Sequence, residues 1–224
     1  MYQERIEKVL SAMEEMGLEQ MLVSNPNSIW YLTGYYVFPY ERMLALYLRR
    51  DGNHALFLNR LFPEPETNYR QIWFSDTDDC VAMVSEQVDG SKPLGIDKEW
   101  PAMFLLPLME HLPGCRCVLA SDCVDAVQAC KDSVEQDLMR EASRINDLVM
   151  ERAAARLKEG VTEKEIADYI VSQYTAEGCD AEAFQTIVSF GPNAADPHHE
   201  PDGTVLKAGD CIVIDMGCKK DRYC

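Results

Sequence analysis

Short apolar runs alternate with amphipathic segments along the first 130 residues, and this alternation most constrains what the chain can fold into. Runs typical of buried strands lie at residues 21–23, 43–48, 55–58, 72–74, 94–97 and 117–119. Apolar residues recur at helical spacing over residues 2–17, 78–88, 101–112 and 122–130. Asp51-Gly52 lies between two of the strand segments and is a strong hairpin signal. Strands that alternate with helices predict a helix-covered sheet, so residues 1–130 are expected to form one α/β domain.

Two further helices are predicted at the start of a second domain, over residues 131–224. Ser133 and Gln136 have the spacing of a capping box, in which each residue's side chain bonds the backbone N–H of the other. Thr162 and Glu165 repeat this spacing at the start of the next helical pattern. The first of these signals places the domain boundary between residues 130 and 131.

The residues best suited to chemistry lie around two predicted strands, 187–190 and 211–214. The loop between the strands carries His198 and His199, and Asp215 follows the second strand. A carboxylate at the end of an apolar strand is expected to be poorly solvated, so Asp215 needs an arginine, backbone donors or a metal ion. Histidines on a polar loop are ordinarily surface residues, and spacing alone gives this pair no role.

Charge and composition exclude several classes of partner. The formal net charge is −17, from 38 acidic and 21 basic residues, so nucleic acid and anionic membranes would repel the chain. No apolar stretch approaches the length of a membrane span, and the charged N-terminus lacks the apolar core of a secretory signal. None of the nine cysteines forms a C-x-x-C pair. We therefore expect free thiols and a cytoplasmic protein without nucleic-acid or membrane partners.

Several short sequence motifs follow one another between residues 189 and 223. They are S-F-G-P-N-A-A-x-P-H-H at 189–199, L-K-x-G-D at 206–210, V-I-D-M-G at 213–217 and a closing Tyr223. This stretch resembles the pita-bread metallopeptidases of family M24: methionine aminopeptidases, Xaa-Pro aminopeptidases and Xaa-Pro dipeptidases (prolidases), with creatinase as a non-metal relative. N-S-I-W-Y-L-T-G at 27–34 and L-G-I-D at 94–97 resemble the N-terminal domain of creatinase and prolidase. The resemblance implies a creatinase-type α/β domain at 1–130 and the α+β first half of a pita-bread domain at 131–224.

The same resemblance implies roles for the candidate site residues. The spacing from His198 to Asp215 is similar to that of the Xaa-Pro branch, where the aspartate is the first metal ligand. His198 matches the histidine that binds substrate and steadies the reacting carbonyl, and His199 is a second candidate for substrate binding. The implied cofactors are two divalent metal ions, Mn, Co, Zn or Fe. The implied substrates are proline-containing peptides, and the implied assembly is a homodimer.

Alternatives to an Xaa-Pro peptidase remain open at this point. Pita-bread domains also serve as non-catalytic peptide- or protein-binding modules, and creatinase is an amidinohydrolase. Creatinase lacks the metal-binding acids, so Asp215 favours the peptidase. Aminopeptidase and dipeptidase activity are not distinguished.

The sequence also departs from the family's pattern. The family's second aspartate, expected shortly after Tyr223, and its later histidine and two glutamates have no counterpart here. The chain is therefore expected to be part of a longer enzyme or a truncated product, inactive on its own.

Overall fold

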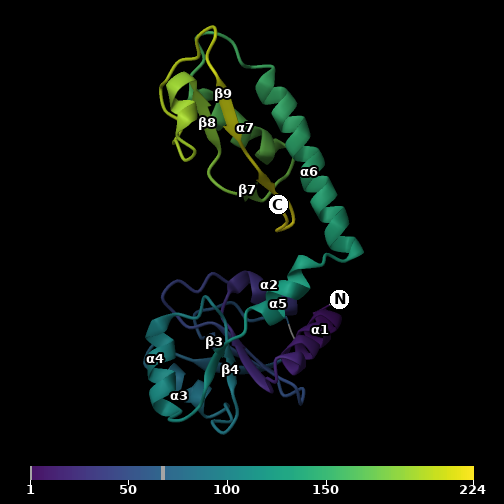
Figure 1. Cartoon of the computed structure of the whole chain (residues 1–224), viewed down its shortest axis with the longest axis vertical. Coiled ribbons are helices and arrows are strands. Elements are labelled where there is room, and N and C mark those ends of the chain that lie inside the picture. The colour runs from purple at the N-terminus through teal and green to yellow at the C-terminus, as the bar shows by residue number, and fades with distance from the viewer. Residues whose placement is uncertain (1, 67–68) are drawn as a thin grey trace. The chain divides into compact units, whose positions relative to one another are not determined.

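A computed structural model describes residues 2–66 and 69–224 of the chain. The chain divides into two units, Met1–Cys130 and Lys131–Cys224, each with its own hydrophobic core (Figure 1). Among the described residues, no helix is both long and apolar enough to cross a membrane.

The first unit is built on a mixed sheet with the strand order β4-β3-β2-β1-β5-β6. The strands are β1 (Gln20–Val23), β2 (Ala45–Arg49), β3 (Ala55–Asn59), β4 (Arg70–Phe74), β5 (Leu94–Ile96) and β6 (Cys117–Leu119). Antiparallel β2 and β3 are joined at the predicted Asp51-Gly52 hairpin, where Gly52 has a φ of 84°. β2 pairs antiparallel with both β1 and β3, and the other neighbouring strands pair parallel, so β2 alone runs against the rest of the sheet.

Helices cover both faces of this sheet. They are α1 (Tyr2–Glu15), α2 (Pro26–Thr33), α3 (Cys80–Ser85), α4 (Ala102–His111) and α5 (Asp122–Ala129). Successive side chains of a strand point to opposite faces. Met21 and Val23 accordingly pack with α1, α2 and α5, whereas Leu22 packs with α3 and α4 (Figure 1). The prediction of a helix-covered sheet is therefore confirmed.

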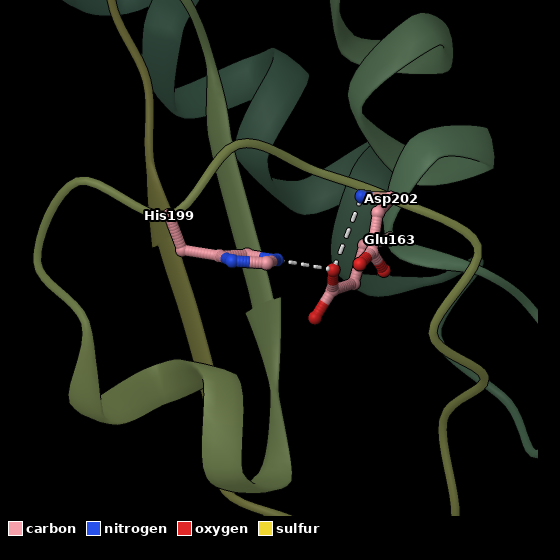
Figure 2. Close-up of side chains that lie close together, drawn as sticks. All are labelled: Glu163, His199 and Asp202. Carbon is pink, nitrogen blue, oxygen red and sulfur yellow. Dashed lines mark hydrogen bonds and ion pairs between the residues drawn. The ribbon is translucent and has the colours of Figure 1, made fainter.

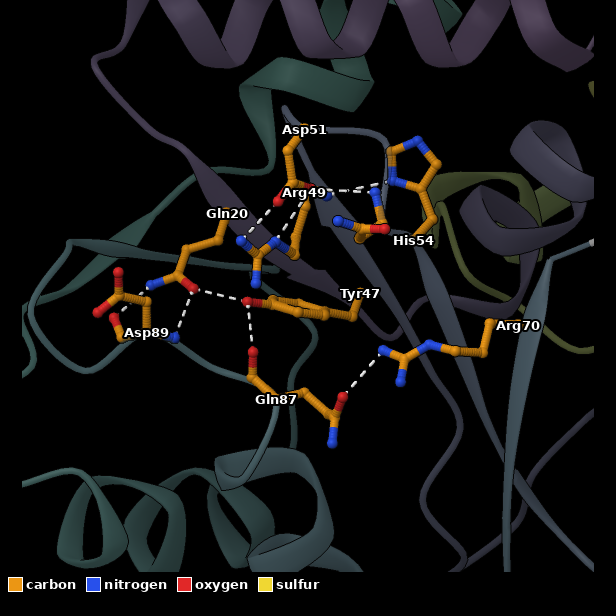
Figure 3. A network of polar contacts seen from close by, with 9 residues as sticks. Gln20, Tyr47, Arg49, Asp51, His54, Arg70, Gln87 and Asp89 are labelled. Carbon is orange, nitrogen blue, oxygen red and sulfur yellow. Dashed lines mark hydrogen bonds and ion pairs between the residues drawn. The ribbon is translucent and has the colours of Figure 1, made fainter.

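A partly buried polar network connects the segment after α3 to the sheet (Figure 3). The Tyr47 hydroxyl lies 2.6 Å from Oε1 of Gln20 and 3.0 Å from the carbonyl oxygen of Gln87. Gln20 also accepts from the backbone N–H of Asp89 at 3.0 Å and donates to its carbonyl at 2.8 Å. Burial raises the pKa of Tyr47 to about 12, so its hydroxyl keeps its proton at neutral pH.

The second unit combines two helices with short antiparallel strand pairs. Its elements are α6 (Ser133–Ala154), α7 (Glu163–Ala176), β7 (Ala181–Glu182), β8 (Ile187–Phe190), the 3-10 helix η1 (Gly191–Ala195), β9 (Ile212–Asp215) and β10 (Cys218–Lys219). β8 pairs with β9, and β7 pairs with β10. Val149, Ile170 and Phe190 lie in the core that the helices share with β8. β9 is more exposed than β8, and its first two residues, Ile212 and Val213, are 36% and 39% exposed.

The capping box of α6 lies one residue earlier than the sequence predicts. Asp132 is the N-cap, its carboxylate accepts from the Glu135 backbone N–H, and the Glu135 side chain accepts from the backbone N–H of Asp132. The expected pair, Ser133 and Gln136, is wrong because aspartate caps helices as well as serine does. The predicted box of Thr162 and Glu165 is confirmed at the start of α7.

Replacing Asp132 by alanine should lower the free energy of unfolding of the second unit by about 1 kcal/mol, the usual cost of losing an N-cap. Ser133→Ala is the matched control and should change it little, because Ser133 is the first helical residue and does not form the box. Urea titration followed by helical circular dichroism measures both. A larger loss from the serine variant would contradict the observed position of the cap.

Candidate active site

The loop between β8 and β9 carries both candidate histidines and begins at a glycine whose conformation and close contacts disfavour a side chain. Gly191 has a φ of 54°, a left-handed conformation that strains other residues. A Cβ at this position would lie 2.9 Å from Oδ1 of Asp210. The backbone N–H of Gly191 also donates to the carbonyl of Cys211 at 2.8 Å. The close approach of the two ends of the loop therefore depends on the absence of a side chain at Gly191.

The carboxylate of Glu163 lies beneath this loop and is completely buried. Its Oε1 accepts from the backbone N–H of Phe190 at 2.7 Å and from the side-chain amide of Asn193 at 3.0 Å. Its Oε2 accepts from Nε2 of His199 at 2.8 Å and from the backbone N–H of Asp202 at 3.2 Å (Figure 2). Hydrogen bonds to donors on both oxygens compensate for the burial of this charge.

His199 is the inner of the two histidines. Its side chain is 16% exposed and forms an ion pair with Glu163. The hydrogen bond to the Glu163 carboxylate, and then the negative charge of that group, raise the pKa of His199 above its ordinary value. The carboxylates of Asp202 and Asp196 act in the same direction, while partial burial opposes them. Glu163 therefore favours the protonated, cationic form of the His199 imidazole.

His198 is exposed and faces a different environment. Its backbone N–H donates to Oδ1 of Asp196 at 3.0 Å, which fixes the turn. This contact does not hold the imidazole ring, whose position follows the path of the loop. A hollow of about 520 Å³ is lined by Phe184, Gln185, Ile187, His198, His199, Glu200 and Asp215. The three residues selected from the sequence, His198, His199 and Asp215, thus lie around one pocket.

Asp215 differs from expectation in its surroundings. It is the last residue of β9, opposite Ile187 of β8, and its side chain is exposed to solvent. The expectation of a poorly solvated carboxylate is wrong, because β9 is exposed along most of its length. Water can solvate Asp215, so burial imposes no need for a partner at this position.

Glu163, His199 and Asp202 also form the one group of three ligating side chains found among the described residues. One potential ligand atom from each lies within 4.8 Å of the other two (Figure 2). However, Oε2 of Glu163 already accepts two hydrogen bonds, and Oδ1 of Asp202 accepts from the backbone N–H of Thr204 at 2.7 Å. A cation here would have to displace several of these contacts, and the arrangement fits a hydrogen-bonded ion pair better.

Glu163 is the residue of this site that the sequence did not reveal. It stands between the two members of the Thr162–Glu165 capping box, where an acid favours the start of a helix without further contacts. Its partner His199 lies 36 residues away. Sequence spacing carried no signal of this pairing.

Comparisons with known proteins agree with this architecture. Residues 5–130 match the Creatinase/Prolidase N-terminal domain, and residues 137–224 match Metallopeptidase family M24. The chain is 32% identical over 224 residues to the protein named "Probable dipeptidase PepE" of Mycobacterium tuberculosis, covering 96% of this chain and 59% of that protein.

Solved structures show the same likeness. Dipeptidase PepE from Mycobacterium ulcerans superposes with a TM-score of 0.89 at 31% identity, over 98% of this chain and 61% of that one. Recombinant prolidase from Thermococcus sibiricus superposes with a TM-score of 0.89 at 27% identity, over 98% of this chain and 62% of that one.

The chain therefore belongs to the family of metallopeptidases that join a creatinase/prolidase N-terminal domain to an M24 domain. The predicted fold, an α/β domain followed by the first half of a pita-bread domain, is confirmed. The chain spans between 59% and 62% of the length of these three relatives.

The ion pair predicts how the histidines titrate. In an NMR titration, His199 should have a midpoint above its unfolded value of about 6.5. Its stabilising contribution is then complete below about pH 6.5 and is lost as the pH rises through the folded-state pKa. His54, whose pKa is lowered by burial, is the internal control and should titrate below 6.5. A midpoint for His199 at or below that of His54 would contradict the ion pair.

Proposed function

We propose that this protein is a peptidase that hydrolyses Xaa-Pro bonds in short peptides with the help of two divalent cations. The observation that carries the proposal is the pocket in which His198 and Asp215 lie together, because it combines a hydrogen-bond donor with a carboxylate ligand. The similarity of the chain to the prolidase of Thermococcus sibiricus supports this choice of substrate.

Proline explains why such a bond needs its own enzyme. The proline nitrogen carries no N–H, and its ring fixes φ. A peptidase that holds the amide hydrogen of the scissile bond therefore cannot hold an Xaa-Pro bond in the same way. The exposed Phe184 and the half-buried Ile187, at the edge of the same pocket, offer an apolar surface against which a proline ring can pack.

His198 is proposed to act on the carbonyl of the scissile bond. Its imidazole lines the pocket, is exposed to an entering peptide and can donate a hydrogen bond to the oxygen as it becomes negative. A donor placed at the developing oxyanion lowers the barrier more than it strengthens binding of the substrate. This assigns His198 the role of the catalytic hydrogen-bond donor. His199 is proposed to contact the substrate at the edge of the pocket and to pair with Glu163.

Asp215 is proposed as a metal ligand. Carboxylate oxygens with nearby imidazoles suit Mn²⁺, Co²⁺, Fe²⁺ and Zn²⁺. Bound cations would polarise the substrate carbonyl and would lower the pKa of a water molecule, so that it could lose a proton and attack as hydroxide. The donor set fits in kind but is incomplete, because no group of three ligating residues forms around Asp215 among the described residues. We infer that the 224 residues alone bind such cations weakly and do not cleave peptides.

A non-catalytic peptide-binding module is the second candidate, and the incomplete donor set around Asp215 favours it. An amidinohydrolase of the creatinase type is a third, weakened by the presence of Asp215. Free cysteines at all nine positions are compatible with the proposed cytoplasmic location. The proposed homodimer rests on the family resemblance.

The complete protein that contains this chain should cleave dipeptides or short peptides with proline in the second position, and a chelator should abolish the cleavage. The same peptides with alanine in place of proline are the control and should be poor substrates. Mass-spectrometric detection of the products with and without added Mn²⁺ measures both. Binding of the proline peptide without cleavage would support the binding module, and full activity in metal-free protein would exclude the cation-dependent peptidase.

His198→Ala in the complete protein should lower kcat about a hundredfold to a thousandfold, the usual loss for one oxyanion donor. Its metal content should stay unchanged, because His198 is not a proposed ligand. His111→Ala is the matched control, since His111 is a half-exposed histidine at the end of α4 in the first unit. Steady-state kinetics and elemental analysis of the three proteins check the assignment, which fails if the two histidine variants behave alike.

A further inference from the structure

The contacts of Glu163 come from both sides of His198 along the chain. Before His198, its Oε1 binds the backbone N–H of Phe190 and the side-chain amide of Asn193. After His198, its Oε2 binds the ring of His199 and the backbone N–H of Asp202. One carboxylate therefore joins the end of β8 to three residues of the loop, while His198 itself touches none of these groups in the hydrogen bonds described.

The start of α7 holds the same loop from the other side. The backbone N–H of Glu163 donates to the carbonyl of Thr204 at 3.1 Å, and that of Lys164 donates to the carbonyl of Asp202 at 3.0 Å. The first N–H groups of a helix have no partner within the helix, so here they bind the loop. Glu163 thus contacts the loop through both its side chain and its backbone, and the loop cannot move without exposing or unpairing a buried charge.

We propose that Glu163 and His199 are a positioning pair that fixes the place of His198 in the pocket, and that they act as a hydrogen-bonded ion pair and not as metal ligands. The carboxylate holds the segments on either side of His198, and the ring of His199 lies 2.8 Å from its Oε2. The role in catalysis rests on the proposed function, whereas the hold on the loop does not.

A distinct energetic signature separates a positioning pair from a general stabiliser. If Glu163 acts on the reaction only by placing His198, then removing Glu163 matters only while the His198 ring is present. A small displacement of a catalytic group can lower the rate about a hundredfold. Two residues in one chain of contacts show non-additive effects, and a double-mutant cycle measures this coupling.

The first test needs no activity. Amide hydrogen exchange is measured on the complete protein and on its Glu163→Gln variant, in which one carboxylate oxygen becomes an N–H₂ group that faces donors. Amides of residues 191–204 should exchange at least about tenfold faster, while those within α6 and the interior of α7 keep their protection. Glu151→Gln, which removes an exposed charge from α6, is the matched control and should change neither set. Equal loss of protection throughout the second unit would overturn the proposal.

The second test is kinetic. Glu163→Gln should lower kcat about a hundredfold with a smaller change in KM, and in the His198→Ala background it should lower kcat by no more than about twofold. An undiminished loss in that background would overturn the positioning role. If the unmodified protein cleaves no Xaa-Pro peptide, the proposed function fails, and the exchange experiment still decides whether Glu163 holds the loop.

His199 variants provide a second route if Glu163→Gln does not fold. His199→Phe removes the donor and should loosen residues 191–204 and lower kcat, whereas His199→Gln keeps an N–H near the position of Nε2 and should recover most of the loss. Titration with Zn²⁺ alone tests whether these residues bind a metal ion instead. Stoichiometric Zn²⁺ binding that disappears in His199→Phe would overturn the ion pair and identify Glu163, His199 and Asp202 as a metal site.

Discussion

A charged carboxylate stays buried in a protein only if donors replace the water it loses, and the second unit is arranged around one such group. Glu163 has no exposed surface, and four donors from the chain between Phe190 and Asp202 converge on it. The path of the loop, the docking of its end on the start of α7 and the inner place of His199 all follow from satisfying this charge. The exposed residues His198 and Glu200 of that loop line the pocket together with Asp215.

The first unit solves a similar problem on a smaller scale. Asp97, at the end of the predicted strand 94–97, is 6% exposed. Its Oδ2 accepts from the backbone N–H groups of Ser24 and Asn25, and its Oδ1 accepts from that of Glu99. A buried acid thus joins the ends of neighbouring strands β1 and β5. In both units, a buried acid beside an apolar segment connects chain segments by accepting from backbone donors.

The parts of the fold that depend on local pattern could be predicted from the sequence. Apolar periodicity and turn residues predicted the strands of the first unit and its helices α1, α3, α4 and α5, because each segment buries one continuous face. The two-residue strands β7 and β10 were missed because such segments have no measurable period. The N-cap of α6 was misplaced because Asp132 and Ser133 are both good caps, and only geometry distinguishes them.

The candidate site shows a sharper limit. His198, His199 and Asp215 were selected from their order along the chain, and the structure places all three around one pocket. Their surroundings could not be predicted. Exposure of Asp215 depends on what covers β9, and the partnership of His199 with Glu163 depends on a contact across 36 residues. Contacts between distant segments leave no periodic trace in a sequence.

The exposure of Asp215 bears on when the proposed metal site can form. A carboxylate that water can solvate destabilises the folded chain very little when no cation is bound to it. Glu163, by contrast, must find its donors for the loop to close at all. Folding of this unit therefore depends on donors for Glu163 and not on neutralising Asp215, so the proposed binding of a cation at Asp215 can follow folding.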